Sequence, residues 1–468
     1  MAGPDGMVGS GGPVEPPVGR TPAAILHARR LRGTLRVPGD KSITHRALIL
    51  AALARGESRI GDGSDGLDCN STAGVLAQLG VQVERLDASD GGRVDRLVRS
   101  PGRAGWREAG SVLDAGNSGT TLRLMAGVLA GTPGRAVLDG DASLRARPVA
   151  RIIEPLRRMG ATLHARAADT LPPLTVEGRS PLMAIAHRTT VPSAQVKSAI
   201  LLAGLSARGT VEVREAVATR DHTERMLRDR GIRVTAETSD GEWVVRMEGG
   251  ATVQARDERV PGDISAAAFW LVAGAAHRDA QLTLEHVGLN PTRRAILDLL
   301  RRMGAEIREE PLATGGSEPG GSEPVGTLTV TTSDLRAVEL DPPDVARAID
   351  EIPAICLAAA CAAGTTRIRG AGELRRKESD RIAGIADGLR ALGVHVSVDG
   401  DDLEIAGRPD LPGFGMTGTT VETRDDHRLA MMFAVAGLLA EGETTLDDAV
   451  STAVSYPGFF TDLERVRA

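Results

Sequence analysis

The sequence predicts an α/β protein in which six similar units bury apolar helices beneath small sheets. Two phrases that alternate along the chain support this prediction. One is a helix that ends at a glycine and leads into a strand. The other is an Ala/Leu-rich helix, a short turn and a strand. Repetition of this kind is typical of a duplicated supersecondary unit.

The first phrase places glycine directly after each helix. A residue in that position often takes the left-handed conformation, which glycine adopts without strain. The five glycines are Gly80, Gly160, Gly231, Gly304 and Gly393.

The second phrase contains helices that are apolar on nearly all sides, which predicts that they are buried. Its strands alternate with period two, as at Arg59–Gly61, Thr210–Val213 and Gln281–Leu284. The sixth copy lacks a full partner phrase, because the chain ends soon after it. The six copies lie near residues 46–60, 121–138, 197–213, 264–284, 351–368 and 427–445.

The composition is that of an ordinary globular protein large enough for more than one domain. The chain has 468 residues, of which 41% are hydrophobic and 25% charged, and its formal net charge of −6 disfavours non-specific nucleic-acid binding. Cys69, Cys356 and Cys361 form no CxxC pair, so we expect buried thiols in a reducing compartment. No His, Cys and carboxylate cluster has metal-ligand spacing.

The ends and loops of the chain carry little chemistry. Residues 1–21 are rich in Gly and Pro and lack an apolar core segment, so they predict a flexible tail rather than a secretory signal. No apolar run is long enough to cross a bilayer, and we expect a cytoplasmic protein. Residues 312–326 contain Gly-Gly-Ser-Glu-Pro twice and predict a surface loop between two strands.

The starts of the buried helices combine capping residues with cations. Ser, Asp, Asn or Gly stands at a plausible N-cap in five of the six copies. Cations in the first turns oppose the helix dipole, and a polyanionic small molecule would resolve that conflict. The alternative is a solvated basic face. The cations concerned are Lys41, Arg46, Arg123, Lys197 and Arg428.

Two further segments fit an anion site. Arg147 precedes Pro148 in a loop that starts a helix. Residues 375–381 hold four cations and two carboxylates, and the i,i+4 spacing of Lys377 and Arg381 predicts one helix face with Glu378 beside it. A solvent-exposed ion-pair face is the alternative for this run.

Eight motifs follow one another along the chain: Pro38–Arg46, Asn117–Arg123, Arg145–Pro148, Ser193–Ser198, Thr219–Glu224, Ile349–Glu351, Arg376–Arg381 and Asp425–Arg428. In this order they resemble the 3-phosphoshikimate 1-carboxyvinyltransferase family, also called 5-enolpyruvylshikimate-3-phosphate synthases. The resemblance runs from about Leu31 to Phe460. Each motif is weak alone, but eight in this order are specific.

The resemblance implies a two-domain inside-out α/β barrel with three βαβαββ units per domain around buried parallel helices. It places one domain at 41–261 and the other at 22–40 joined to 262–468, with the active site in the cleft between them. It also implies a cytoplasmic enzyme, expected to be a monomer, with no cofactor, no metal, no nucleic-acid partner and no membrane partner.

The reaction implied is transfer of the enolpyruvyl group of phosphoenolpyruvate to the 5-hydroxyl of shikimate 3-phosphate, with release of phosphate, in the shikimate pathway to chorismate and the aromatic amino acids. By resemblance, Asp350 is the base near the hydroxyl, Glu378 serves the methylene carbon and Lys41 contacts both substrates. Shikimate 3-phosphate would be bound by Lys41, Ser42, Arg46, Ser193, Ala194, Gln195, Arg220, Asp350 and Lys377. Phosphoenolpyruvate would be bound by Lys41, Gly119, Arg147, Gln195, Arg381 and Arg428.

The chain departs from the family pattern at two positions. Ala194 stands where some members have a second serine, which puts one phosphate contact in doubt, and Arg220 is the candidate to replace it. Val454 stands where many members have a lysine, which puts a cation to phosphoenolpyruvate in doubt. Gly119 is glycine, whereas glyphosate-tolerant members often have alanine, so the resemblance implies inhibition by glyphosate.

Two rival functions remain open on the sequence alone. A sister enzyme transfers enolpyruvyl to a UDP-linked amino sugar, but its usual Lys-Asn pair is Lys41-Ser42 here and Cys69 lies outside its usual loop. The other rival is a non-catalytic anion-binding or scaffold protein on the same fold. The presence of Asp350 and Glu378 beside the cations disfavours it.

Overall fold

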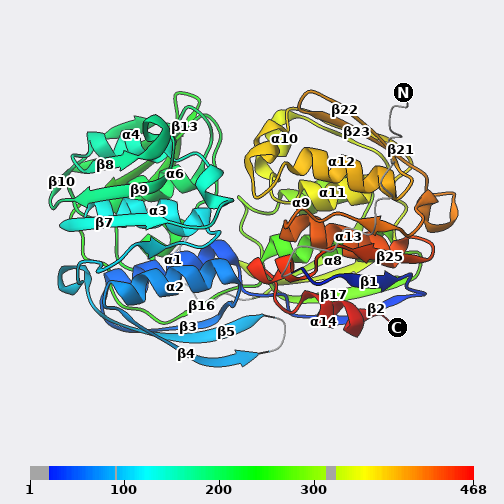
Figure 1. Ribbon diagram of the computed structural model, residues 1–468, viewed down its shortest axis with the longest axis horizontal. Coiled ribbons are helices and arrows are strands. Elements are labelled where there is room, and N and C mark those ends of the chain that lie inside the picture. Colours follow the sequence, from blue (N-terminus) through cyan, green and yellow to red (C-terminus); the bar gives the residue numbers. More distant parts are fainter. Residues whose placement is uncertain (1–19, 90–91, 313–322, 468) are drawn as a thin grey trace, which may run out of the picture.

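The computed structural model describes residues 20–89, 92–312 and 323–467, which form two lobes side by side (Figure 1). We call residues 41–261 lobe 1, and residues 20–40 together with 262–467 lobe 2. Each lobe has its own hydrophobic core: one lies within residues 43–260, and the other joins residues 25–37 to 264–466. A separate hydrophobic core in each lobe is typical of a domain.

One sheet topology recurs through both lobes. In each four-stranded sheet the second strand is parallel to the first and antiparallel to the third, and the fourth is antiparallel to the third. In lobe 1, in spatial order, the sheets are β16 (Glu258–Arg259), β3 (Arg55–Ser64), β5 (Arg93–Pro101), β4 (Gln82–Ser89); β6 (Leu113–Asp114), β7 (Gly134–Asp139), β9 (Leu171–Gly178), β8 (Thr162–Ala165); and β11 (Ala186–Arg188), β13 (Thr210–Glu215), β15 (Glu242–Glu248), β14 (Val234–Ser239). A short pair also joins β10 (Leu182–Met183) to β12 (Ala207–Arg208).

Lobe 2 repeats the topology, and its last sheet is completed from the start of the chain. The antiparallel strand β1 takes the third place beside β25, which supplies a partner that the sixth sequence copy lacks. The sheets are β2 (Leu31–Leu35), β17 (Ala280–Gly288), β19 (Val325–Thr331), β18 (Glu306–Pro311); β20 (Glu339–Leu340), β21 (Gly364–Ile368), β23 (Asp402–Gly407), β22 (His395–Asp399); and β24 (Thr420–Val421), β25 (Glu443–Leu446), β1 (Ala23–Leu26).

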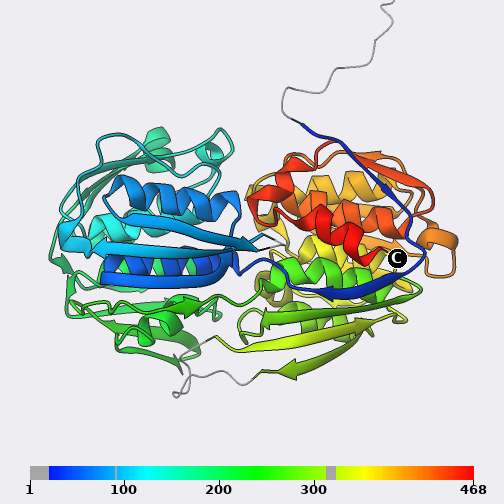
Figure 2. The same ribbon diagram turned by 90° about the horizontal axis from the view of Figure 1, so that it is seen from below.

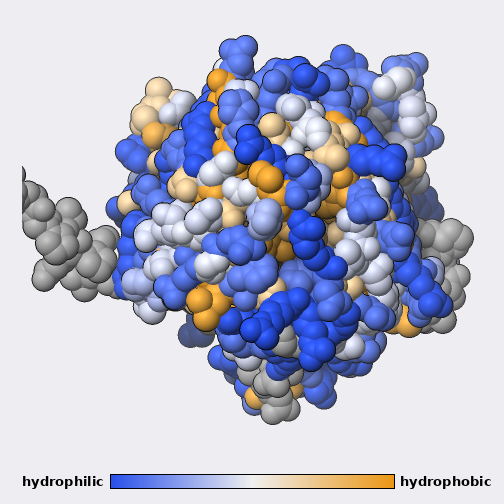
Figure 3. All heavy atoms as spheres, turned by 90° about the vertical axis from the view of Figure 1, so that its right-hand side faces the viewer, coloured by the Kyte–Doolittle hydropathy of each residue, from blue (hydrophilic) through white to orange (hydrophobic). Residues whose placement is uncertain are grey.

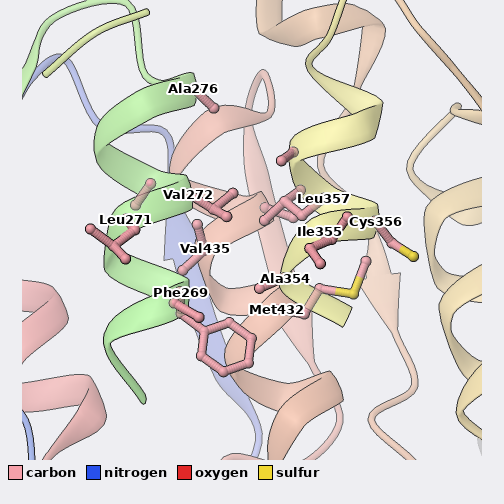
Figure 4. Close-up of a cluster of buried hydrophobic side chains, with 14 of the residues drawn as sticks. Phe269, Leu271, Val272, Ala276, Ala354, Ile355, Cys356, Leu357, Met432 and Val435 are labelled. Carbon is pink, nitrogen blue, oxygen red and sulfur yellow. The ribbon is translucent and has the colours of Figure 1, made fainter. Parts of the chain in front are cut away.

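Six apolar helices fill the interiors of the lobes, as the sequence predicts. Every residue of α8, α11 and α13 is buried, and these helices pack against one another through side chains such as Phe269, Ile355 and Val435 (Figure 4). Burying one such side chain contributes about 1.5–3 kcal/mol. The six are α1 (Lys41–Leu53), α3 (Gly119–Ala130) and α6 (Ala194–Gly204) in lobe 1, and α8 (Ile264–Ala276), α11 (Ile352–Ala360) and α13 (His427–Leu439) in lobe 2.

The remaining helices flank the sheets, and each buries a smaller share of its residues than the six apolar helices do. They are α2 (Leu67–Gln78), α4 (Ala150–Arg158), α5 (Arg166–Asp169), α7 (His222–Arg228), α9 (Ala295–Arg302), α10 (Pro342–Arg347), α12 (Arg381–Ala391) and α14 (Phe459–Val466). No described helix is long and apolar enough to span a membrane. The outer end of lobe 2 shows mostly hydrophilic residues with scattered apolar spots (Figure 3).

The helix ends follow the predicted local chemistry. All five predicted glycines have positive φ, between 81° and 104°. Five of the six buried helices have an N-cap side chain that accepts a backbone N–H; α11, which follows Glu351, is the exception. The five capping residues are Asp40, Ser118, Ser193, Asp263 and Asp426.

The chain crosses between the lobes twice, and the two crossing segments pair with each other (Figure 2). The Asp40 N–H donates to the Pro261 carbonyl at 2.7 Å, and the Asp263 N–H donates to the Pro38 carbonyl at 2.9 Å. Strand β2 precedes α1 in sequence but pairs with β17 of lobe 2, whereas β16 precedes α8 but pairs with β3 of lobe 1. The helices α1 and α8 therefore begin together at the junction of the lobes.

Three predicted segments need comment. Lys377 and Arg381 do not share a helix face, because a 3₁₀ turn ends at Arg376 and Asp380 caps α12, which begins only at Arg381. Most of the predicted loop at 312–326 and residues 1–19 of the predicted tail lie outside the described residues. Arg20 is described, and it pairs with Asp425 and Asp447.

Candidate active site

A cavity of about 340 Å³ lies between the lobes, where the N-terminal ends of several buried helices meet. Residues at the starts of α1, α3 and α6 line it from lobe 1, and residues just before α11 and at the start of α13 line it from lobe 2. Unpaired backbone N–H groups and the helix dipoles make this region favourable for anions. The predicted site residues that line it are Lys41, Ser42, Arg46, Gly119, Arg147, Ser193, Ala194, Gln195, Arg220, Asp350, Lys377, Glu378 and Arg428.

Lys41 is the first residue of α1 and lies among carboxylates. Its Nζ lies 3.0 Å from Asp68 Oδ2, and its backbone N–H donates to Asp263 at 3.3 Å. Burial lowers the pKa of Lys41, but the charges of Asp68 and Glu378 outweigh burial and hold its pKa above the ordinary value. Lys41 is therefore a firmly charged group at the junction of the lobes.

Asp350 lies directly before α11 and faces cations from both lobes. Lys377 Nζ is 3.1 Å from its Oδ1, and Arg220 of lobe 1 donates to its Oδ2. Burial alone would raise the pKa of Asp350, but Lys377, Arg220 and two further arginines hold it well below the ordinary range. The Asp350 carboxylate is thus ionised. It becomes a stronger base when another anion draws these cations away from it.

Glu378 lies in the turn before α12, within a chain of charge-assisted hydrogen bonds. Arg381 donates through Nη2 to Glu378 at 2.6 Å and through Nε to Asp426 at 2.8 Å. Arg147 of lobe 1 lies 3.6 Å from Glu378. Burial raises the Glu378 pKa, but Arg381 and Arg147 outweigh it, and the pKa lies well below the ordinary range.

Of the predicted site residues, all of which the structure describes, Arg381 alone lies outside the lining of the cavity. Its side chain is 1% exposed, and it holds Glu378 and Asp426 while its Nη1 lies 3.8 Å from Asp350. The structure therefore places Arg381 behind the carboxylates that face the cavity. Direct contact with a substrate is the predicted role, whereas the geometry shows Arg381 supporting the wall.

Lobe 1 contributes polar groups whose positions are fixed by the helix starts. Ser193 caps α6 by accepting the Val196 N–H, and Gln195 stands in the first turn of the same helix. Gln195 accepts a hydrogen bond from Arg123 at 2.7 Å and donates to Thr120 Oγ1 at 2.9 Å. These bonds tie α6 to α3 at the cavity wall.

Two arginine side chains lie close to the backbone of Gly119, the first residue of α3. A Cβ placed there would lie 2.7 Å from Arg123 Nη1 and 3.5 Å from Arg147 Nη1. Arg147 in turn donates to Asn117. The glycine therefore leaves room for two guanidinium groups at the N-terminus of α3.

The structure gives roles at the site to three residues for which the sequence predicts no substrate. Asp68, in the first turn of α2, pairs with Lys41, and Asp426 anchors Arg381. An acidic residue in a first turn stabilises any helix, so nothing in the sequence marks Asp68 as part of a site. Arg123 is one of the cations at the helix starts, and neither substrate is assigned to it. The structure places it in the lining of the cavity.

Lys197 corrects one expectation about those cations. It does not line the cavity, because its Nζ lies 2.8 Å from Glu215 and 2.9 Å from Glu224, with all three side chains buried. The charge that resolves its conflict with the helix dipole is internal rather than a bound anion. Among the described residues, no group of three or more His, Cys, Asp or Glu side chains is arranged to hold a metal ion.

Comparison with known proteins decides the family. A profile described as EPSP synthase (3-phosphoshikimate 1-carboxyvinyltransferase) matches residues 26–463. The chain is 44% identical over 436 residues to the 3-phosphoshikimate 1-carboxyvinyltransferase of a Bacillus cereus strain, covering 93% of this chain and 97% of that protein. This chain belongs to the EPSP synthase family.

Solved structures agree with membership in the EPSP synthase family and confirm the α/β fold class. EPSP synthase from Acinetobacter baumannii is similar with a TM-score of 0.81 and 37% identity, covering 95% of this chain and 98% of that chain. The enolpyruvyl transferase NikO from Streptomyces tendae gives a TM-score of 0.73 at 21% identity, covering 96% and 98%. The second likeness concerns the fold alone.

Proposed function

We propose that this protein transfers the enolpyruvyl group of phosphoenolpyruvate to the 5-hydroxyl of shikimate 3-phosphate and releases phosphate. One observation carries the proposal within the EPSP synthase family. Asp350 and Glu378 face the same cavity as cations and helix N-termini from both lobes. Such a cavity suits two small molecules with several negative charges and supplies carboxylates for proton transfer.

Shikimate 3-phosphate binds on the side formed by α1, α6 and the segment before α7. Arginine offers a planar fork of donors to phosphate and carboxylate groups, and serine and amide groups add single hydrogen bonds. Ala194 lacks the hydroxyl with which a second serine would contact the phosphate. Arg220 replaces that contact. The residues are Lys41, Ser42, Arg46, Ser193, Ala194, Gln195, Arg220, Asp350 and Lys377.

Phosphoenolpyruvate binds at the start of α3 and against the wall of lobe 2. Lys41 and Gln195 contact both substrates, and the Gly119 backbone lies beside the phosphate. Arg381 acts mainly through Glu378, to which it donates a 2.6 Å hydrogen bond. Val454 provides no cation, so Arg147 and Arg428 carry more of the binding than in members with a lysine there. The residues are Lys41, Gly119, Arg147, Gln195, Arg381 and Arg428.

The reaction needs three proton transfers. Asp350 accepts the proton of the 5-hydroxyl as its oxygen attacks C2 of phosphoenolpyruvate, and an acid delivers a proton to C3, which becomes a methyl group. Glu378 serves that carbon, and a base then removes a methyl proton as the C2–O bond to phosphate breaks. Positioned acid and base groups each contribute about 10²–10⁴-fold.

Substrate binding itself makes the carboxylates better bases. Lys377 and Arg220 hold the pKa of Asp350 well below its ordinary range, and Arg381 and Arg147 do the same for Glu378. When phosphate and carboxylate groups of the substrates attract those cations, their hold on Asp350 and Glu378 weakens and both pKa values rise. The acid–base groups become competent when both substrates are present.

The protein acts on these small molecules as a monomer in the cytoplasm, without a metal, a cofactor, a nucleic-acid partner or a membrane partner. Glyphosate, which carries phosphonate and carboxylate groups, competes with phosphoenolpyruvate because Gly119 leaves the start of α3 uncrowded. These properties follow from the family resemblance and extend the proposal.

Phosphate release tests the proposal directly. The purified protein is mixed with phosphoenolpyruvate and either shikimate 3-phosphate or a UDP-linked amino sugar. Release with shikimate 3-phosphate alone supports the proposal, and release only with the UDP-linked sugar assigns the protein to the sister reaction. Absence of release with either acceptor indicates a non-catalytic role.

A further inference from the structure

A cluster of buried charges lies behind the cavity wall of lobe 1. Lys197 on α6 pairs with Glu215 at the end of β13 and with Glu224 on α7, at 2.8 and 2.9 Å. The three side chains are at most 1% exposed, and none lines the cavity. Buried charges are costly unless they are matched, so the cluster calls for a structural or functional reason.

Charge balance connects the cluster to Arg46. One lysine and two glutamates leave one negative charge in excess. Arg46 is also buried. Burial lowers the pKa of Arg46, and the negative charge of Glu224 is the largest effect that raises it. Arg46 therefore offsets part of the excess negative charge of the cluster, among nearby charges that also include Arg220, Asp40 and Glu323.

The same helices hold Arg46 in one orientation. Ser198, next to Lys197, accepts from Arg46 Nη2 at 2.7 Å, and Thr223, next to Glu224, accepts from Nε at 2.7 Å. The Ser42 carbonyl accepts from Nη1 at 2.8 Å. A guanidinium has five N–H groups, so these bonds leave one N–H on each terminal nitrogen without a described protein partner. Arg46 lines the cavity, so these N–H groups are available to an anion there.

The cluster also fixes the segment that carries Arg220. Thr219 donates through Oγ1 to Glu215 Oε1 at 2.6 Å, and its carbonyl accepts from Lys197 Nζ at 3.3 Å. Arg220 follows directly and reaches Asp350 across the cleft. One buried cluster thus sets the positions of two arginines that face the cavity.

We propose that Lys197, Glu215 and Glu224 are positioning residues that aim Arg46 and Arg220 at the anionic groups of shikimate 3-phosphate. This inference rests on the proposed function and extends it to residues outside the cavity. The cluster acts on one substrate only, because Arg46 and Arg220 are assigned to shikimate 3-phosphate and not to phosphoenolpyruvate.

The test compares the two substrates in Glu224→Gln, which keeps the size of the side chain but removes its charge. We expect the KM for shikimate 3-phosphate to rise about tenfold or more, as for a weakened charged hydrogen bond. The KM for phosphoenolpyruvate should change little, and kcat should change less than the KM for shikimate 3-phosphate, although Arg220 also contacts Asp350. Asp462→Asn is the matched control, because Asp462 is another buried carboxylate, hydrogen-bonded to Tyr456 in lobe 2 and away from the cavity.

If Glu224→Gln acts only through a general loss of stability, it should behave like the control, with both KM values changed or neither. That result would overturn the inference. If Glu224→Gln fails to fold, Thr223→Val decides, because it keeps every charge and removes one hydroxyl, which accepts from Arg46 Nε and hydrogen-bonds to Ser198 Oγ. A selective rise in the KM for shikimate 3-phosphate supports positioning, and an unchanged KM overturns it. Failure of the parent protein to release phosphate with shikimate 3-phosphate would instead refute the proposed function.

Discussion

The two sides of the cleft are built from the same unit, yet they carry different chemistry. Among the described residues, the lining from lobe 1 is rich in cations and has a single carboxylate, Asp68, whereas lobe 2 contributes Asp263, Asp350, Glu373 and Glu378 together with cations of its own. The repeated unit brings helix N-termini to the cleft on both sides. The residues at those helix starts then set the chemistry, since Lys41 begins α1 while Asp350 closely precedes α11. We infer that lobe 1 mainly binds and lobe 2 mainly performs proton transfer.

The largest effect should follow from neutralising the carboxylates of lobe 2. In Glu378→Gln and Asp350→Asn, kcat should fall about 10²–10⁴-fold, much more than either KM changes, because a proton-transfer group is lost. Steady-state phosphate release measures both parameters. Glu373→Gln is the control, since Glu373 lines the same wall but pairs with Arg151 near solvent. Near-normal turnover in either variant would remove that residue from the mechanism.

A large loss of stability should follow from Asp426→Asn, because Asp426 is the buried anchor of Arg381. Breaking a buried ion pair costs about 3–5 kcal/mol. Burial raises the pKa of Asp426, but Arg381 outweighs it, and the folded pKa lies below the ordinary value. The contribution of Asp426 is therefore present above the ordinary carboxyl pKa and is lost as the pH falls through the lower, folded pKa.

Urea denaturation at several pH values measures this prediction. The parent protein should be more stable than Asp426→Asn at neutral pH, and the gap should narrow in acid below a pH of about 4. Equal stability at neutral pH would show that Arg381 does not depend on Asp426.

A smaller and selective effect should follow on the lobe 1 side from Arg46→Lys. Lysine keeps the charge but cannot supply the fork or the bonds to Ser198 and Thr223. The KM for shikimate 3-phosphate should rise about 10–100-fold with kcat nearly unchanged at saturation. Arg145→Lys, in an outward-facing pair with Asp139, should leave the KM unaltered. A drop in kcat without a change in KM would reverse the division between the lobes.

The smallest effect is expected from Gly119→Ala, which adds a methyl group at the start of α3. The new Cβ would meet the end of a flexible side chain, Arg123, so the fold should tolerate it within about 1 kcal/mol. Displaced guanidinium groups should raise the KM for phosphoenolpyruvate a few-fold. They should raise the inhibition constant for glyphosate by a larger factor. Inhibition constants for glyphosate in both proteins measure this. A parent enzyme fully active in millimolar glyphosate would contradict the expectation.

Local chemistry was predictable from the sequence. The N-cap residues, the left-handed glycines and the burial of the Ala/Leu helices depend on neighbours within a few positions, and the structure confirms them. Nearly all the residues expected in the site also line one cavity. That result required the ordered motifs, because no single segment distinguishes an anion site from a capped helix.

Long-range pairing was not predictable in the same way. The exchange of β2 and β16 between the lobes depends on partners some 200 to 250 residues away. The same limit explains Lys197, whose position in the sequence suggests a cavity-facing cation although Glu215 and Glu224 surround it in the fold. It also explains Asp68, whose partner Lys41 lies on another helix.

The division of binding and proton transfer between the lobes is tested most directly by single-turnover phosphate release. The enzyme is in excess over phosphoenolpyruvate, and shikimate 3-phosphate is saturating. We predict that Arg46→Lys then releases phosphate at nearly the parent rate, because saturation compensates for weaker binding. Glu378→Gln should remain slow by about 10²–10⁴-fold, because its defect lies in proton transfer. A slow Arg46→Lys together with a fast Glu378→Gln would contradict the account.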